Sequence, residues 1–212
     1  MEARFWHQKW NDNNIGFHEQ KPNDFLTGNF GRLKLAHNTR IFLPLCGKTL
    51  DIAWILSKGY KIVGAELSPL AIEQLFETLK LTPKITDIGN LQLFSAPNID
   101  IFVGDIFDVS SKMLGKIDAV YDRAALVALP QDMRSRYTQH LMKITNNAAQ
   151  LLVCFEYDQS LTQGPPFSID EAEIRKHYAP YYALNLVDSR DMGGMVRGIS
   201  IGNENVWLLS RP

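Results

Sequence analysis

The chain has 212 residues, of which 45% are hydrophobic and 21% charged, and its 22 basic and 23 acidic side chains give a formal net charge of −1. This size and composition indicate one globular domain, and the charge balance argues against a protein that binds nucleic acid through its phosphates. No apolar run approaches the roughly 18 residues of a membrane helix, and the N-terminus lacks the apolar core of a signal peptide, so we expect a cytoplasmic protein with no membrane partner.

From residue 40 onward, short apolar runs typical of strands alternate with runs typical of helices. Five strands are predicted in chain order, at residues 40–45, 60–65, 99–103, 117–121 and 150–156. Helices are predicted at residues 49–58, 69–79 and 131–144. Residues 181–210 offer two weaker strands joined around Gly193 and Gly194. Apolar strands separated by helices indicate an α/β fold, with a mostly parallel sheet covered on both faces and finished by a hairpin.

The N-terminal segment, residues 1–39, differs in kind from the rest of the chain. Trp6 and Trp10 lie four positions apart and so share one helix face, and the polar run at residues 11–14 ends that helix. Taken alone, the two tryptophans could simply cover the core. We interpret this segment as an appendage to a sheet formed by residues 40–212, within one domain that spans the whole chain.

Charged and polar residues stand where the predicted strands end. In an open α/β sheet a ligand binds beyond the carboxyl ends of the strands, where the strand order reverses. The residues at four such ends are Leu45 to Lys48, Glu66, Asp105 with Ile106, and Asp122 with Arg123. Glu66 follows Gly47 by 19 residues, close to the interval of about 20 at which an acidic residue meets a ribose in nucleotide-binding units. A carboxylate suits that position because it accepts hydrogen bonds from both ribose hydroxyls.

The loop at residues 45–49 argues against two common nucleotide sites. It has one glycine where a dinucleotide fingerprint has three, so its backbone would not approach a pyrophosphate closely. Its Gly47-Lys48-Thr49 run resembles the end of a phosphate-binding P-loop, but Phe42 stands where that motif requires its first glycine. A nucleoside ligand without a pyrophosphate remains, and S-adenosylmethionine fits that description.

Each of these residues, taken alone, has a simpler interpretation. A Glu at a strand end is more often solvated than functional, and Asp122 and Arg123 could form a local ion pair. Cys46 and Cys154 have no neighbouring ligands, which indicates buried thiols. The histidines show no ligand spacing, so no metal is expected; they are His7, His18, His37, His140 and His177. Charged residues at successive strand ends are nevertheless hard to obtain from packing alone, and the combination indicates a ligand site.

With these residues assembled, the chain resembles the bacterial thiopurine S-methyltransferases over most of its length. The matching stretches are residues 5–10, 17–18, 43–48 with 51, 63–68, 104–107, 118 with 121–130, and 164–167. The Pro44-Leu45-Cys46-Gly47-Lys48 run and the Asp122-to-Pro130 run are specific, because most methyltransferases of this fold carry neither. The part after about Lys176 matches least.

The resemblance implies the Rossmann-like seven-stranded fold of class I S-adenosylmethionine-dependent methyltransferases. Its strands would follow the order 3-2-1-4-5-7-6 with the last strand antiparallel, and its N-terminal segment would be a helical lid over the ligands. The implied activity is transfer of the methyl group of S-adenosylmethionine to the sulfur of an aromatic or heterocyclic thiol such as a thiopurine.

The resemblance also implies roles for single residues. Those expected at the methyl donor are Trp10, Leu45, Glu66, Asp105, Ile106 and Arg123, with Glu66 at the ribose. Those expected at the acceptor are Phe17, Trp6, and either Arg190 or Arg197. No catalytic residue is certain: Arg123 could favour a thiolate by its charge, and Asp122 could orient Arg123 or assist a proton.

Two other functions stay open at this stage. The acceptor could be a small selenium or tellurium species, which resembles a thiolate in size and polarisability and would make the protein a metalloid-detoxification enzyme. The chain could alternatively be a non-catalytic protein that binds a nucleoside. The partner that we expect is a small-molecule thiol, not nucleic acid, and the chain is expected to be a monomer.

Overall fold

In the computed structural model, which describes residues 3–191, 193 and 202–211, one mixed sheet of nine strands runs through the molecule. The strands are β1 (Arg40–Pro44), β2 (Lys61–Glu66), β3 (Lys84–Ile88), β4 (Leu91–Ala96), β5 (Ile99–Val103), β6 (Ala119–Arg123), β7 (Ala149–Tyr157), β8 (Ala183–Asp191) and β9 (Gly202–Ser210). The α-helices are α1 (Ala3–Asn11), α2 (Asp24–Asn29), α3 (Leu50–Ser57), α4 (Pro69–Leu79), α5 (Ser111–Leu114), α6 (Gln131–Thr145) and α7 (Glu171–Tyr178). Short 3-10 turns lie at Phe30–Leu33, Ile106–Asp108, Leu126–Ala128 and Gln159–Leu161.

The order of the strands in the sheet is β3-β4-β5-β2-β1-β6-β7-β9-β8. Strands β5, β2, β1, β6 and β7 are mutually parallel, whereas β9 runs antiparallel to both of its neighbours. The last seven strands of this order, from β5 to β8, therefore have the expected order and directions. The expected count of seven is wrong, because an antiparallel hairpin of β3 and β4 extends the sheet beyond β5.

The five strands and three helices predicted between residues 40 and 157 are confirmed, with one shift that matters. The fourth predicted strand lies at Ala119–Arg123 and not at residues 117–121, so Arg123 is the last residue of β6 and not a loop residue. Helix α4 begins at an N-cap, where the Ser68 hydroxyl accepts from the amide of Ala71, and Pro69 opens the helix.

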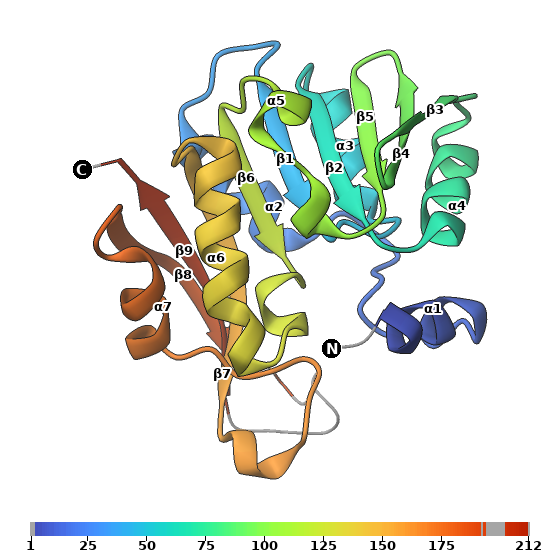
Figure 1. The fold of residues 1–212 in the computed structure, drawn as a ribbon. Coiled ribbons are helices and arrows are strands. Elements are labelled where there is room, and N and C mark those ends of the chain that lie inside the picture. The colour runs from blue at the N-terminus through green and yellow to red at the C-terminus, as the bar shows by residue number, and fades with distance from the viewer. Residues whose placement is uncertain (1–2, 192, 194–201, 212) are drawn as a thin grey trace.

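Two apolar layers hold the helices against the sheet. One face packs against α5, α6 and α7, and the other against α2, α3 and α4; the two layers lie in front of and behind the sheet in Figure 1. Side chains of a strand alternate between the faces, so Phe42 belongs to the first layer whereas Ile41 and Leu43 belong to the second. Each large apolar side chain buried in this way contributes about 1.5–3 kcal/mol.

The N-terminal segment divides into two parts. Helix α1 ends at Asn11, as the polar run predicts, and lies below α4, beyond the lower ends of the strands (Figure 1). Residues 24–33 instead join the core, where Phe25, Leu26 and Phe30 pack with the layer of α3 and α4. No described residue before position 24 belongs to either apolar layer.

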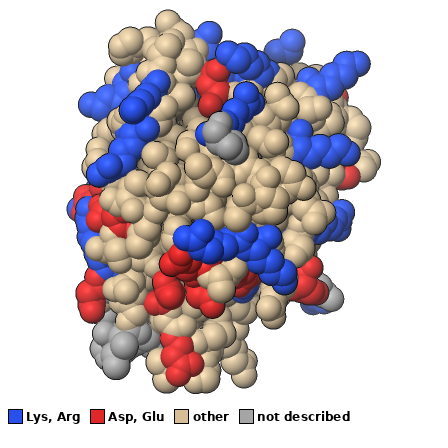
Figure 2. Space-filling model, turned by 90° about the vertical axis from the view of Figure 1, so that its left-hand side faces the viewer, with Lys and Arg blue, Asp and Glu red and all other residues tan. Residues whose placement is uncertain are grey.

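The outer surface mixes charges of both signs. Lys and Arg share the face shown in Figure 2 with Asp and Glu, in keeping with the net charge of −1. Among the described residues, no helix is both long and apolar enough to cross a bilayer.

Candidate active site

A cavity of about 740 Å³ lies at the carboxyl ends of the parallel strands, a size within the range of small-molecule sites. Residues at the ends of β1, β2, β6 and β7 line it, together with the loop after β5, the start of β9 and the N-terminal segment up to Glu19. It therefore spans the point between β1 and β6 where the strand order reverses, as the sequence predicts. Eight of the predicted residues meet around it, namely Trp6, Trp10, Phe17, Leu45, Glu66, Asp105, Ile106 and Arg123.

The loop after β1 turns sharply into α3. Leu45 has a φ of +47° and Gly47 a φ of +52°, which is the left-handed region that side-chain-bearing residues rarely adopt. A Cβ atom on Gly47 would lie 3.0 Å from the indole of Trp10. This position therefore combines a backbone conformation that favours glycine with a close approach of the N-terminal helix.

Glu66 joins the loops that follow β1 and β2. Its buried carboxylate accepts from the amide of Gly47 at 2.7 Å through Oε2 and from the amide of Ser68 at 2.9 Å through Oε1. Burial raises the pKa of this carboxyl group, and the backbone amides of Ser68, Gly47 and Leu67 oppose that rise. Each oxygen keeps a lone pair for a ligand, and the side chain lines the cavity. The carboxylate is therefore held in place before a ribose diol would meet it.

The loop after β5 forms the next part of the wall. Asp105 caps a short turn by accepting from the amide of Phe107 at 2.9 Å, and its side chain is exposed to the cavity mouth. Ile106 is buried, and its carbonyl lies 2.9 Å from Nε2 of His140 on α6. An apolar side chain beside a carboxylate is compatible with the adenine that the resemblance implies here.

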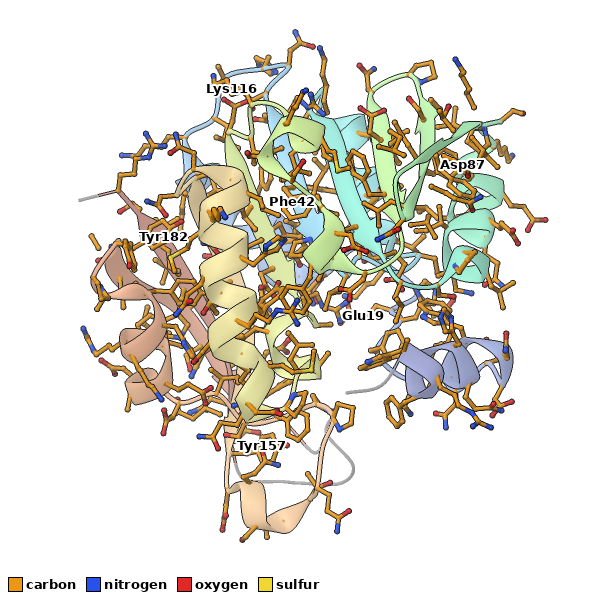
Figure 3. The ribbon with its side chains drawn as sticks, in the orientation of Figure 1. Glu19, Phe42, Asp87, Lys116, Tyr157 and Tyr182 are labelled. Carbon is orange, nitrogen blue, oxygen red and sulfur yellow. The ribbon has the colours of Figure 1, made fainter. Side chains whose placement is uncertain are left out.

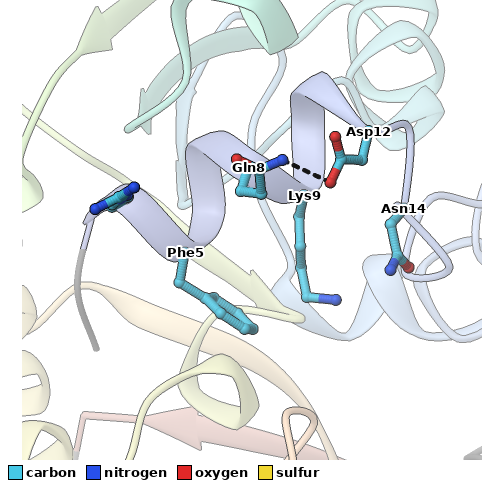
Figure 4. Close-up of a pocket in the computed structure, with 6 residues that line it drawn as sticks. Phe5, Gln8, Lys9, Asp12 and Asn14 are labelled. Atoms are coloured by element: carbon cyan, nitrogen blue, oxygen red, sulfur yellow. Dashed lines mark hydrogen bonds between the residues drawn. The ribbon is translucent and has the colours of Figure 1, made fainter.

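Aromatic side chains of the N-terminal segment cover the cavity. Phe17 meets the edge of Trp10 at 5.5 Å and of Trp6 at 5.9 Å between ring centroids. Such edge-to-face pairs contribute about 0.5–1.5 kcal/mol beyond the area that they bury. Another side of α1 borders a surface hollow lined by Phe5 and polar side chains, where Gln8 donates to Asp12 at 2.7 Å (Figure 4). Helix α1 thus turns its tryptophans toward the cavity.

Arg123 and Asp122 are neighbours on β6 whose side chains point to opposite faces. The guanidinium of Arg123 lines the cavity, forms an ion pair with Glu19 and donates to the carbonyl of Phe17 at 3.4 Å. Glu19 lies between the strand ends and α1 (Figure 3). The contact therefore joins the N-terminal segment to the end of β6.

Asp122 does not line the cavity, although the sequence suggested it as a catalytic candidate. It is fully buried against α6, where it accepts from the hydroxyl of Tyr137 at 2.7 Å and from the amide of Leu126 at 3.1 Å. Burial raises its pKa to about 6. Its geometry is that of a core carboxyl group, because the alternation of β6 directs it away from Arg123.

The two arginines suggested for the acceptor have different outcomes. Arg190 lies on the edge strand β8, where its guanidinium stacks on Phe25 at 4.2 Å and reaches Asp188 at 3.1 Å; it does not line the cavity. Arg197 lies outside the described residues.

Sequence reasoning missed three acidic residues that line the cavity, namely Glu19, Asp51 and Glu204. Glu19 has no motif around it. Glu204 lines the cavity from the start of β9 and is only 6% exposed. A signal for Glu204 existed in principle, because a carboxylate two positions before the apolar run Val206 to Leu209 is costly to bury unless it has a purpose.

The model of the family described as thiopurine S-methyltransferase matches residues 1–212. The chain belongs to this family. A protein named thiopurine S-methyltransferase from Xanthobacter autotrophicus is 51% identical over 212 residues, with 100% of both chains covered. Another of that name, from Teredinibacter turnerae, is 48% identical over 211 residues, covering 100% of this chain and 98% of the relative. The resemblance, and with it the activity of an S-methyltransferase, is confirmed.

Solved structures support the fold and the methyl donor. A didemethyltoxoflavin N1-methyltransferase of Burkholderia thailandensis, solved with S-adenosylhomocysteine, aligns with a TM-score of 0.68 at 12% identity over 99% of this chain and 87% of that one. Magnesium protoporphyrin IX methyltransferase of Synechocystis, also with S-adenosylhomocysteine bound, aligns with a TM-score of 0.62 at 13% identity over 99% and 100%. The fold is thus that of S-adenosylmethionine-dependent methyltransferases, and S-adenosylmethionine is the methyl donor of this family member.

Proposed function

We propose that this protein transfers the methyl group of S-adenosylmethionine to the sulfur of aromatic or heterocyclic thiols, thiopurines among them. The observation that carries the proposal is one cavity with a preoriented carboxylate, Glu66, at the ends of β1 and β2, and a guanidinium, Arg123, at the end of β6. Glu66 suits a ribose, and Arg123 suits an anionic acceptor covered by aromatic rings.

At the donor side, the residues suit the parts of a nucleoside with an amino-acid tail. Glu66 would accept hydrogen bonds from the ribose, Asp105 and Ile106 would border the adenine, and Leu45 and Trp10 would lie beside the amino-acid part. When bound, S-adenosylmethionine supplies an electrophilic methyl group on a positively charged sulfur. The chain's own contribution there is to fix orientation through side chains that are already held in place.

At the acceptor side, Arg123 and the rings of Phe17 and Trp6 would hold a planar thiol. The guanidinium stabilises negative charge on the sulfur or on a ring nitrogen, and the rings exclude water. Alignment of two reactants in this way can lower a barrier by about 7–11 kcal/mol. The segment before residue 24 would act as the lid, because its aromatic residues and Glu19 cover the cavity and belong to neither apolar layer.

Titration calorimetry with S-adenosylhomocysteine, followed by a methyl-transfer assay with a panel of thiols, tests the proposal. We expect micromolar binding that Glu66→Ala abolishes and that Glu73→Ala, an exposed glutamate on α4, leaves unchanged. We then expect transfer to thiopurines and other heterocyclic thiols, with selenium and tellurium oxyanions as comparison acceptors. Methylation of those anions without any thiol would contradict the proposed acceptor, and absence of binding to the folded wild type would contradict the donor site.

A further inference from the structure

Glu204 is a buried carboxyl group in the cavity wall that the donor site does not use. Its side chain is 6% exposed and lines the cavity. No hydrogen bond joins its carboxyl group to another residue that the structure describes. Glu66, by contrast, holds two backbone amides. Burying a carboxylate is costly, and this one faces the cavity, which raises the question of what it meets when the cavity is filled.

Strand pairing places Glu204 on the same face of the sheet as Arg123. Glu204 lies opposite Phe155 in the antiparallel pair of β7 and β9, and Arg123 lies opposite Val153 in the parallel pair of β6 and β7. Val153 and Phe155 are two positions apart and so share a face. Adjacent strands are about 4.8 Å apart, so the backbones of β6 and β9 are separated by roughly 10 Å. Both charged side chains line the same cavity, so an acceptor bound there can meet both of them.

The groups around Glu204 set its protonation. Burial raises its pKa to about 7; Glu19 acts in the same direction, whereas Arg123 and Arg190 oppose it. Arg190 is its cross-strand neighbour on β8, Arg123 approaches from β6, and Glu19 belongs to the N-terminal segment. A carboxyl group in this environment exchanges a proton near neutral pH, which is the property of an effective general base.

We propose that Glu204 is the general base that removes the proton of the acceptor thiol. This inference rests on the proposed function. In the step, the S–H bond breaks, its electron pair stays on the sulfur, and the proton moves to a carboxylate oxygen of Glu204. The sulfur pair then forms the bond to the methyl carbon, while the electrons of the old carbon–sulfur bond return to the sulfur of the donor. Glu204 afterwards releases its proton to water.

The assignment predicts which acceptors depend on Glu204. A thiol that is already ionised at neutral pH needs only the positive charge of Arg123. A thiol with a pKa above about 8, as in ordinary alkyl thiols, must lose its proton in the site. Glu204 therefore extends the acceptor range toward weakly acidic thiols.

Glu204→Gln, assayed with two acceptors, tests the inference. For phenylmethanethiol, a weakly acidic thiol, we expect kcat/KM to fall by about 10²-fold, in the range of general-base contributions. For 4-nitrothiophenol, which is ionised at pH 7, we expect a change of less than about threefold. With the first acceptor the wild-type rate should rise with pH and level off above about 7, whereas the rate of the variant, which can use only thiol that has already ionised, should keep rising toward the pKa of the thiol. Glu156→Gln is the matched control, because Glu156 lies next to Phe155 on β7 but points to the opposite face and does not line the cavity.

A second measurement does not depend on turnover. Because the pKa of Glu204 is raised from 4.5 to about 7, its ionisation makes wild-type unfolding easier as pH rises through that window. Glu204→Gln should lose this pH dependence and should bind S-adenosylhomocysteine as the wild type does. Equal loss of rate with both thiols, or no loss with either, would overturn the role of Glu204 but not the proposed function. Failure of the wild type to methylate any thiol would overturn the proposed function and this inference with it.

Discussion

Replacing Asp122 by Asn should separate a core role for this residue from a catalytic one. The wild-type carboxyl group is fully buried and is held by Tyr137 and Leu126. Asn keeps its shape and one acceptor oxygen but cannot ionise. We expect the variant to retain methyl transfer, because Asp122 does not line the cavity, and to change how stability depends on pH.

The size of that change follows from the pKa. Burial raises the pKa of Asp122 from 3.8 to about 6, and at about 1.4 kcal/mol per pKa unit this corresponds to about 3 kcal/mol. The pKa of Asp122 is higher in the folded than in the unfolded state, so its protonated form stabilises the fold. This stabilisation is fully present below about pH 4 and is lost as pH rises through about 6. The stability of Asp122→Asn relative to wild type should therefore improve by about 3 kcal/mol from pH 4 to pH 7. Its weaker hydrogen bonds cost about 1 kcal/mol at every pH.

Urea unfolding of both proteins at half-unit steps between pH 4 and pH 8 measures this difference. Other groups that titrate, Glu204 among them, are common to both proteins and cancel. Near pH 7 the net difference of about 2 kcal/mol corresponds to a shift of roughly 4–8 °C in Tm. A stability difference that stays constant with pH would refute the reasoning, and loss of methyl transfer with unchanged stability would assign Asp122 a part in the reaction.

Two further variants probe the N-terminal segment. Gly47→Ala should lower the unfolding free energy by about 1–2 kcal/mol from the left-handed backbone alone. It should also weaken S-adenosylhomocysteine binding, because the new Cβ displaces Trp10. Gly28→Ala, whose Cβ meets nothing within 4 Å, is the control and should not weaken binding. Unchanged calorimetric affinity for Gly47→Ala would contradict the contact. Glu19→Gln should cost less than about 1 kcal/mol in stability, yet should lower the KM for ionised thiols because Arg123 loses its partner. A raised KM would show instead that the ion pair orients the arginine.

The parallel core of the sheet could be predicted because its strands are buried on both faces and are apolar throughout. The edge hairpin could not, since β3 has only exposed or partly exposed residues and lacks the alternation that marks a half-buried strand. The same limit explains the missed helix α5, which has four residues. Short or exposed elements are fixed by neighbours that a local pattern does not contain.

The donor side of the site could be predicted from the rule for strand ends, which located Leu45, Glu66 and Asp105 correctly at the cavity. The acceptor side could not, because its residues depend on strand register. A shift of two residues in β6 decides where the strand ends, and alternation then separates Asp122 from Arg123. Glu204 reaches the cavity only through the antiparallel insertion of β9, which has no local signature.

The position of β9 also affects how the chain folds. Gly202–Ser210 is the last strand in chain order, yet it lies between β7 and β8 and forms ladders with both. Until these residues leave the ribosome, the largely apolar β7 has an open edge on the side of β9, a known hazard for aggregation. Completion of the sheet, closure of this part of the cavity wall and arrival of Glu204 at the site therefore belong to one late folding event. A polypeptide released before residue 202 would have the donor loops but neither a finished sheet nor Glu204.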